Sequence, residues 1–376
     1  MRALASVSSL ALILAIAQPG VAPAQPAPAS VAPTSADRLV LPSPKAGHAA
    51  PLVVVVADKA GAETTDFLAP YGVLKESGVA EVISVSTAVG PVQLRTAVKI
   101  QPDETTEAFD AEAPEGADVV IVPAQVRPDS PALIAWIRSQ AAKGATIVSI
   151  CEGASVLAKA GLLDGKRATT HWSVIKGLER RYPHTTWVRD LRYVQDGRII
   201  STTGVSASIP VSLALVEAMA GHAAARATAD RIGITDWSAD HHTDDFTITR
   251  ADVKSALSAA ASFWTHETLE APIADGTDEI ALALQTEAWG RTFHARVVTT
   301  RPGRGAVTSR RGLVILPDSA PQRGRHVIES HPEAAPGQLD ATFVDVARRY
   351  GPEAVRLGLL ALEYDPPSPP AALALR

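Results

Sequence analysis

The 376-residue sequence contains a single cysteine, so no disulfide can form within one chain. It also lacks a basic excess: 35 Lys and Arg stand against 40 Asp and Glu, for a formal net charge of −5. The charge balance therefore gives no sign of a nucleic-acid partner. Beyond the N-terminal region, no apolar run is long and charge-free enough to span a membrane. With 46% hydrophobic residues, the chain can still bury one large core or two ordinary ones.

The first 24 residues have the order of a secretory signal peptide. A positive charge at Arg2 is followed by an apolar run at 10–17 and by small residues at 22–24 that suit a cleavage site. The run is shorter than the ~20 residues of a membrane span, although an uncleaved anchor helix is an alternative. We therefore expect an exported protein, periplasmic or secreted. Residues 25–50, rich in Pro and Ala, are expected to form a flexible linker.

Short β-branched runs alternate with helix-like segments from residue 51 onward. The runs lie at 52–57, 82–85, 118–122, 146–150 and 198–201, and the helix-like segments between them at 63–76, 130–143 and 155–160. Continuous apolar runs are typical of strands buried on both faces. The alternation predicts an α/β fold with a doubly wound, mostly parallel sheet. Residues 206–231 indicate one buried helix, which would close a first domain at 51–233.

The second part of the chain, 234–365, contains a partial echo of the first. Residues 275–279, 295–299 and 306–318 follow the order and spacing of 60–63, 80–84 and 91–103. This pattern predicts a degenerate α/β half-repeat, unless two segments of similar composition align by chance. The echo stops before any counterpart of the only cysteine, so the copy would be catalytically silent. It would pack against the first domain or against a second subunit.

Three further segments complete the second part. The basic, glycine-rich stretch 301–311 indicates a hairpin or loop, and 343–362 indicates one late helix. Residues 366–376 are expected to form a flexible tail. The run 240–245 groups residue types that bind metals, but adjacent side chains rarely converge on one ion. We expect a solvated acidic loop there, and neither a metal nor a cofactor.

The cysteine follows directly after an apolar strand. Cys151 is succeeded by Gly153 and the small Ala154, which let the chain turn into a helix. This strand–turn–helix order is that of a nucleophile elbow at the carboxyl edge of a sheet. The adjacent helix N-terminus would favour the thiolate, and backbone amides after Cys151 could hold an oxyanion. The alternative is a buried, inert cysteine, which is less expected in an exported protein exposed to oxidation.

The turn at Cys151 is accompanied by four further segments, 63–71, 160–165 (AGLLDG), 168–172 (ATTHW) and 193–207. Together they resemble the ThiJ/PfpI superfamily of glutamine-amidotransferase-like folds. Within it, the sequence most resembles isocyanide hydratases and the amidase-like sensor domain of AraC-type regulators. The resemblance covers about 51–233. It implies that Cys151 is the nucleophile, that Asp66 approaches the sulfur from the first helix, and that His171 lies nearby. A helix-capping Asp66 and a structural His171 are the alternatives.

The resemblance also implies which groups surround the substrate. Backbone or pocket contacts are expected from Glu152, Gly153, Ala124, Thr170, Gly204 and Val205. Two positions depart from the relatives. Glu152 stands where isocyanide hydratases have threonine, which puts that reaction in doubt. Ala124 lies in a loop where relatives often have paired glycines, and alanine still supplies an amide.

The sequence therefore predicts a cysteine-dependent hydratase or C–N hydrolase that acts on a small electrophile. Peptidase or glyoxalase-like chemistry would share the same elbow. The competing hypothesis is a non-catalytic ligand or redox sensor. A small-molecule substrate or ligand is the expected partner, together with a possible homodimer. Residues 234–376 show no second, basic recognition helix, so we expect no DNA binding.

Overall fold

The computed structural model describes residues 38–261, 266–303, 305–330 and 335–366. The predicted signal peptide, the first half of the predicted linker (25–37) and nearly all of the predicted tail lie outside these ranges. The end of the linker segment lies against the first domain. Leu39 is buried, the backbone of Val40 bonds with Gln195, and Lys45 and His48 bond with Asp118.

Seven strands form the central sheet in the order β10-β11-β7-β6-β1-β2-β5. Their bounds are β1 Leu52–Ala57, β2 Glu81–Ser86, β5 Glu104–Thr105, β6 Val119–Val122, β7 Thr146–Ser149, β10 Tyr193–Asp196 and β11 Ile199–Thr202. Every neighbouring pair is parallel except β10 with β11, an antiparallel hairpin at one edge. The predicted mostly parallel sheet is therefore confirmed.

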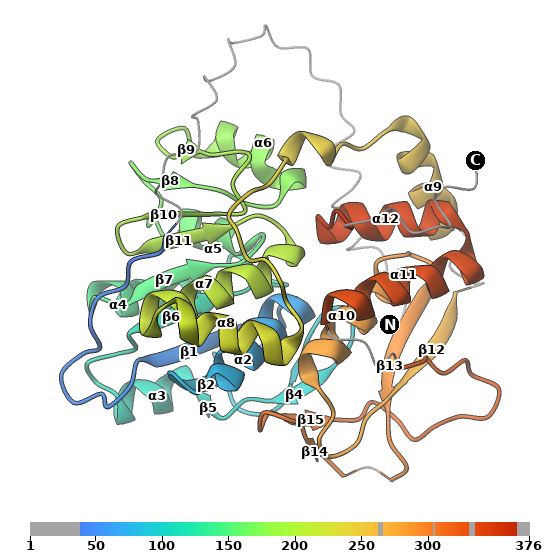
Figure 1. Ribbon diagram of the computed structural model, residues 1–376, viewed down its shortest axis with the longest axis horizontal. Helices are drawn as coiled ribbons and strands as arrows, with labels where there is room; N and C mark the ends of the chain where they lie inside the picture. The colour runs from blue at the N-terminus through green and yellow to red at the C-terminus, as the bar shows by residue number, and fades with distance from the viewer. Residues whose placement is uncertain (1–37, 262–265, 304, 331–334, 367–376) are drawn as a thin grey trace, which may run out of the picture.

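Helices cover both faces of this sheet, as the all-buried strands require (Figure 1). On one face lie α2 (Thr64–Ser77), α7 (Ser208–Ala220) and α8 (His222–Ile232), which share a core with Val53 and Val55. On the other lie α3 (Thr106–Glu112), α4 (Pro131–Ala142) and α5 (Gly153–Lys159), packed with Val54 and Val56. Beyond β7, a small sheet of β8 (Arg167–Ala168) and β9 (Thr186–Trp187) flanks α6 (Trp172–Arg181).

Two predictions of a single long helix were wrong. The segment 206–231 forms a 3-10 turn at Val205–Ala207 and then α7 and α8, separated by Gly221. The late segment forms α11 (Ala335–Tyr350) and α12 (Pro352–Leu362), separated by Gly351. Both glycines have a φ near +85°, a backbone conformation that favours glycine and does not continue a helix. An apolar run that continues across a glycine hides such a break.

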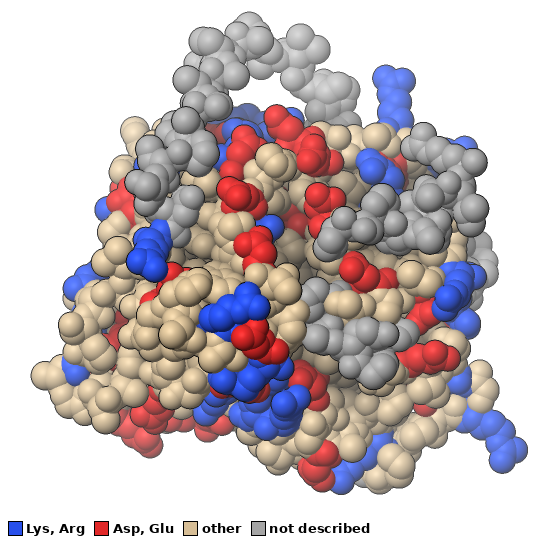
Figure 2. Space-filling view, in the orientation of Figure 1, with Lys and Arg blue, Asp and Glu red and all other residues tan. Residues whose placement is uncertain are grey.

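The second part of the chain lies beside the first (Figure 1). It contains α9 (Arg250–Ala261), β12 (Glu267–Pro272), α10 (Glu279–Gly290), β13 (Ala295–Thr300), β14 (Val307–Thr308), β15 (Val314–Leu316), α11 and α12. The hairpin expected near 301–311 is present as β14 and β15. On the face shown in Figure 2, Lys and Arg are interspersed with Asp and Glu.

The second part reproduces the hydrogen bonding of its counterpart in the first. In the first, Asp103 accepts hydrogen bonds from the backbone and hydroxyl of Ser84. In the second, Asp318 accepts the same pair of bonds from Thr299, the counterpart of Ser84. The hairpin of β3 (Val92–Gln93) and β4 (Lys99–Gln101) likewise matches that of β14 and β15. The half-repeat is therefore present in the fold as well as in the sequence.

The two copies pair with each other about an approximate two-fold axis. β4 and β15 are antiparallel, and Ile100 lies opposite Ile315, its own counterpart. The helices α2 and α10 pack in the same reciprocal way. A Cβ on Gly72 would lie 2.6 Å from Ile280, while Glu287, the counterpart of Gly72, accepts a bond from the backbone of Thr65. The half-repeat thus packs against the first domain of the same chain.

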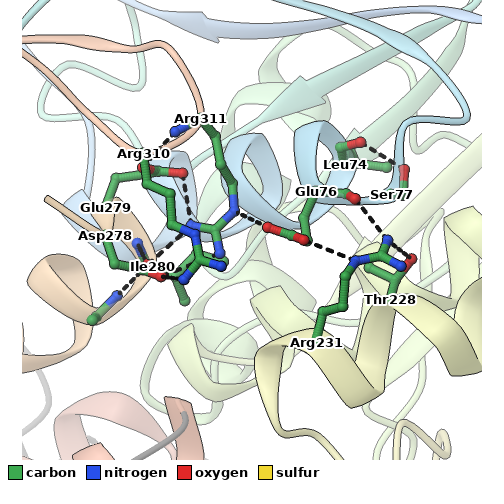
Figure 3. A network of polar contacts seen from close by, with 11 residues as sticks. Leu74, Glu76, Ser77, Thr228, Arg231, Asp278, Glu279, Ile280, Arg310 and Arg311 are labelled. Atoms are coloured by element: carbon green, nitrogen blue, oxygen red, sulfur yellow. Dashed lines mark hydrogen bonds and ion pairs between the residues drawn. The ribbon is translucent and has the colours of Figure 1, made fainter. Parts of the chain in front are cut away.

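Arg311 holds this contact together on one side (Figure 3). Its Nε donates to Glu76 on α2 at 2.8 Å, and its Nη1 donates to Asp278 and Glu279 at 3.0 Å each. The Arg311 side chain is 5% exposed and that of Glu279 is fully buried. Buried charges are tolerated only when they are paired, so Arg311 neutralises acidic groups from both halves.

We predict that Arg311→Ala lowers the free energy of unfolding by about 3 kcal/mol, because it leaves Glu279 buried without its cation. The neighbouring Arg310 is the matched control. Its side chain is 55% exposed and lies 3.5 Å from Asp278, so Arg310→Ala should cost less than about 1 kcal/mol. Urea unfolding of both variants measures the difference, and equal losses would contradict the assigned role of Arg311.

Candidate active site

Cys151 lies at a strained turn between β7 and α5. Its φ of 55° is left-handed, which is unusual for a residue other than glycine. Its backbone N–H donates to Thr202 Oγ1 at 3.1 Å, and its carbonyl accepts from Thr170 Oγ1 at 2.9 Å. A Cβ on Gly153 would lie 2.2 Å from the carbonyl oxygen of Val122, so only glycine fits there. The predicted elbow is present at the carboxyl edge of the sheet.

Asp66 lies in the first turn of α2 and is completely buried. The backbone N–H of Ala124 donates to its Oδ2 at 3.1 Å, and Ser208 Oγ lies 3.4 Å from Oδ1. Burial raises the pKa of Asp66 to about 7, although both contacts oppose the shift. The negative charge of Asp66 in turn raises the pKa of Cys151. The two predicted residues, Asp66 and Cys151, are therefore electrostatically coupled.

Cys151 is 6% exposed, and the pKa of its thiol is raised well above the ordinary value. Burial is the largest cause, followed by the negative charges of Asp66, Glu152 and Glu363. This is the opposite of the thiolate that we expected beside a helix N-terminus. The favourable field of a seven-residue helix is outweighed here by loss of water and by three carboxylates. These causes favour the protonated thiol over the thiolate at rest.

His171 is the N-cap of α6. Its Nδ1 lies 2.6 Å from Ser173 Oγ, and its Nε2 lies 3.3 Å from the carbonyl oxygen of Ala361 at the end of α12. Burial lowers its pKa, which favours the neutral imidazole. Among the described residues, no hydrogen bond joins His171 to Cys151. The structural alternative for this histidine fits its contacts.

The predicted amide donors are mostly engaged within the fold. Ala124 donates to Asp66, Gly153 donates to the carbonyl of Ile150, and Gly204 donates to Glu363. The Glu152 backbone bonds the Cys151 sulfur, a contact that opposes the rise in the pKa of the thiol. The Glu152 carboxyl itself has a raised pKa, caused by burial. Val205 is buried at the start of the 3-10 turn beside Gly204.

Glu363 is a site residue that sequence reasoning missed. It follows α12 directly, and its side chain is fully buried. Its Oε2 accepts from the backbone of Gly204 at 2.7 Å and of Trp172 at 3.2 Å, and its Oε1 lies 2.8 Å from His241 Nε2. His241 belongs to the loop that we expected to be solvated, yet it is buried. No local pattern marks a lone glutamate after an apolar helix, so the sequence carried no signal for it.

A second missed carboxylate comes from α10. Glu287 is fully buried, and its Oε2 accepts from the backbone N–H of Thr65 at 2.8 Å. Burial raises its pKa to about 8, and the charge of Asp66 adds to the rise. Arg291 lies 3.1 Å from Glu287 and also pairs with Glu63, the N-cap of α2. The half-repeat therefore places a buried carboxyl group and a guanidinium next to the first turn of α2, which carries Asp66.

Other features of the described chain lie apart from this site. Two surface pockets, one beside Lys45 and Asp118 and one beside Glu217 and Trp237, are not lined by Cys151. Within the described residues, no three His, Cys, Asp or Glu side chains are grouped to hold a metal ion. No helix in this part of the chain combines the length and apolar character of a membrane span.

The same domain is found in known proteins. A family model described as the DJ-1/PfpI family matches residues 52–218. The isonitrile hydratase of Pseudomonas putida is 36% identical over 160 residues, which are 42% of this chain and 67% of that protein. The chain belongs to the DJ-1/PfpI family. Its elbow cysteine, buried aspartate and parallel sheet all lie in this family domain, whereas Glu287 and Glu363 lie outside the matched residues.

Relatives of this DJ-1/PfpI domain include regulators as well as an enzyme. The HTH-type transcriptional regulator CdhR of Pseudomonas aeruginosa is 35% identical over 130 residues, 34% of this chain. This chain spans only 37% of the length of that regulator. The crystal structure of Drosophila melanogaster DJ-1beta is 24% identical, with a TM-score of 0.45, and covers 50% of this chain and 100% of its own.

The raised pKa of Asp66 predicts a pH-dependent stability. An unfolded aspartate titrates near pH ~3.9, whereas the folded group titrates near 7. Between these values the folded state binds more protons, so the stabilisation present below pH ~4 is lost as the pH rises to about 7. Glu287 acts in the same direction up to a pH of about 8.

We therefore expect the urea midpoint of the wild type to fall between pH 5 and pH 8, and Asp66→Asn to fall less. The exposed Glu107 on α3 offers a control, because Glu107→Gln should keep the wild-type slope. An Asp66→Asn variant with the full wild-type slope would contradict a buried, protonated Asp66.

Proposed function

We propose that this family member is a cysteine-dependent enzyme that hydrates, or hydrolyses a C–N bond of, a small electrophilic substrate. The observation that carries the proposal is Cys151 at a strained turn, electrostatically coupled to a buried Asp66 whose pKa is about 7. A carboxyl that titrates near neutrality can both accept and return a proton. The similarity to an isonitrile hydratase supports the same chemistry.

The reaction needs proton transfer as well as attack, because the resting sulfur is a thiol. As Sγ forms a bond to the electrophilic carbon, its proton passes to the Asp66 carboxylate and from there to the substrate. In C–N hydrolysis the C–N bond then breaks and the amine leaves with that proton, whereas in hydration no group leaves. Water then adds to the same carbon and the S–C bond breaks. The sulfur leaves with a proton, so the thiol is regenerated and the net reaction consumes one water. The Glu152 amide, which bonds the sulfur, lies where it can stabilise developing negative charge.

We predict that Cys151→Ala abolishes turnover and that Asp66→Asn lowers kcat by about 10²- to 10⁴-fold, the range of general acid–base catalysis. Purified protein should be screened against isonitriles, 2-oxoaldehydes, amides and peptides. Glu107→Gln, on the opposite face of the sheet from α2, should keep wild-type activity. Retained turnover in a folded Cys151→Ala variant would overturn the proposal.

A non-catalytic ligand sensor is the second candidate. It is favoured by the raised pKa of Cys151 and by Glu363, which occupies the Gly204 amide that a substrate would use. The similarity to the regulator CdhR fits the same function. A ligand that binds wild type and Cys151→Ala with equal affinity, and leaves no product, would favour the sensor over the enzyme.

We also propose export of the chain through its N-terminal segment, on the strength of the signal-like order of residues 1–24. Cell fractionation with N-terminal sequencing of the mature protein tests this. A homodimer stays a prediction, and light scattering of the purified full chain tests it.

A further inference from the structure

Glu363 lies beside the turn that carries the only cysteine of the chain. Thr202 and Thr170 bond the Cys151 backbone, and two residues further along each segment the amides of Gly204 and Trp172 donate to Glu363. Asp66, Glu152 and Glu363 each raise the pKa of Cys151 through their charge. Arg95 acts on Asp66 and on Glu152 and offsets part of their charge. Glu363 faces two histidines instead: His241 at 2.8 Å, and His171, whose pKa is lowered by burial. Burial favours the protonated forms of Asp66 and Glu152, so a negative charge near the sulfur depends on Glu363, the carboxylate supplied by the second half of the chain.

Glu363 cannot turn away from this position without losing its partners. Both carboxylate oxygens are engaged, by the backbone amides of Gly204 and Trp172 and by His241. A Cβ at position 204 would lie 2.5 Å from the Glu363 Cβ, so the glycine there admits this close approach. The end of α12 is also held by Trp172 Nε1, which donates to the carbonyl of Leu360 at 2.8 Å. The Glu363 carboxylate is therefore buried and held in one position, because its hydrogen bonds and the anchored end of α12 fix it.

We propose that Glu363 selects substrates of the Cys151 site by charge, so that the site takes a neutral or cationic electrophile and rejects one that carries a carboxylate. A fixed negative charge in a site that excludes water repels an anion far more strongly than it would in bulk water. The inference rests on the proposed function, since it names the class of substrate for that site. It assigns a specificity-determining role to a residue outside the family domain.

Alkylation of Cys151 tests the selection without a known substrate. Because Cys151 is the only cysteine, every thiol label reports on this site. Iodoacetamide is neutral and iodoacetate is an anion, and both react in the same way: an S–C bond forms, the C–I bond breaks, iodide leaves and the thiol proton passes to solvent. The ratio of the two rates cancels any effect of a variant on the thiol pKa. It therefore measures the charge preference alone.

Glu363→Gln should lower the ratio of the iodoacetamide rate to the iodoacetate rate by about tenfold, because it removes one nearby charge and keeps the shape. Glu363→Asp retains the charge and should keep a ratio close to wild type, which separates charge from packing. The matched control is Glu353→Gln on α12, the helix that Glu363 follows. Glu353 is exposed and bonded to Ser255, so its removal should leave the ratio unchanged.

An unchanged ratio in folded Glu363→Gln would overturn the proposal. So would native protein that neither reagent labels while unfolded protein is labelled, because a site closed to so small a reagent selects nothing. These outcomes are independent of turnover. If Glu363→Gln shifts the ratio but the wild type is inactive on every substrate tested, the result counts against the proposed enzyme and supports charge selection. If the wild type is active but Glu363→Gln does not shift the ratio, the result supports the enzyme and counts against charge selection.

Discussion

The antiparallel pairing of β4 with β15 joins the two halves of the chain, and both halves supply residues to the site around Cys151. It joins a segment of the first domain to its own repeat, with Ile100 opposite Ile315, and extends one four-stranded sheet across both halves. The same arrangement packs α10 against α2, the helix that carries Asp66. Through α11, which packs on α10, it supports α12 and so places Glu363 beside Gly204.

The resulting site combines a family domain with charges from a copy that has no nucleophile. The elbow and Asp66 come from the DJ-1/PfpI domain, while Glu287 and Glu363 come from the second half. Burial raises the pKa of Asp66 and, together with the negative charges of Asp66, Glu152 and Glu363, it raises the pKa of Cys151. The site favours a neutral thiol at rest, and nucleophilic attack then requires proton transfer to accompany substrate binding.

Much of the fold could be predicted because its signals are local. The β-branched run at 52–57 became β1 at the same bounds, since a strand buried on both faces must be apolar throughout. Cys151 and Gly153 marked the elbow, because the turn demands a residue without a Cβ next to the Val122 carbonyl. The breaks at Gly221 and Gly351 were missed, since an apolar pattern on both sides of a glycine fits one helix as well as two.

The sequence by itself determined the sheet, the elbow and the existence of a repeat, because each depends on residues close together in the chain. The family resemblance added the pairing of Asp66 with Cys151. Only the tertiary structure decided the charge of the site. Glu363 and Gly204 are 159 positions apart, and Glu287 and Thr65 are 222 apart. No periodicity reports such contacts, since they arise from how two halves pack, and burial then fixes which groups keep their protons.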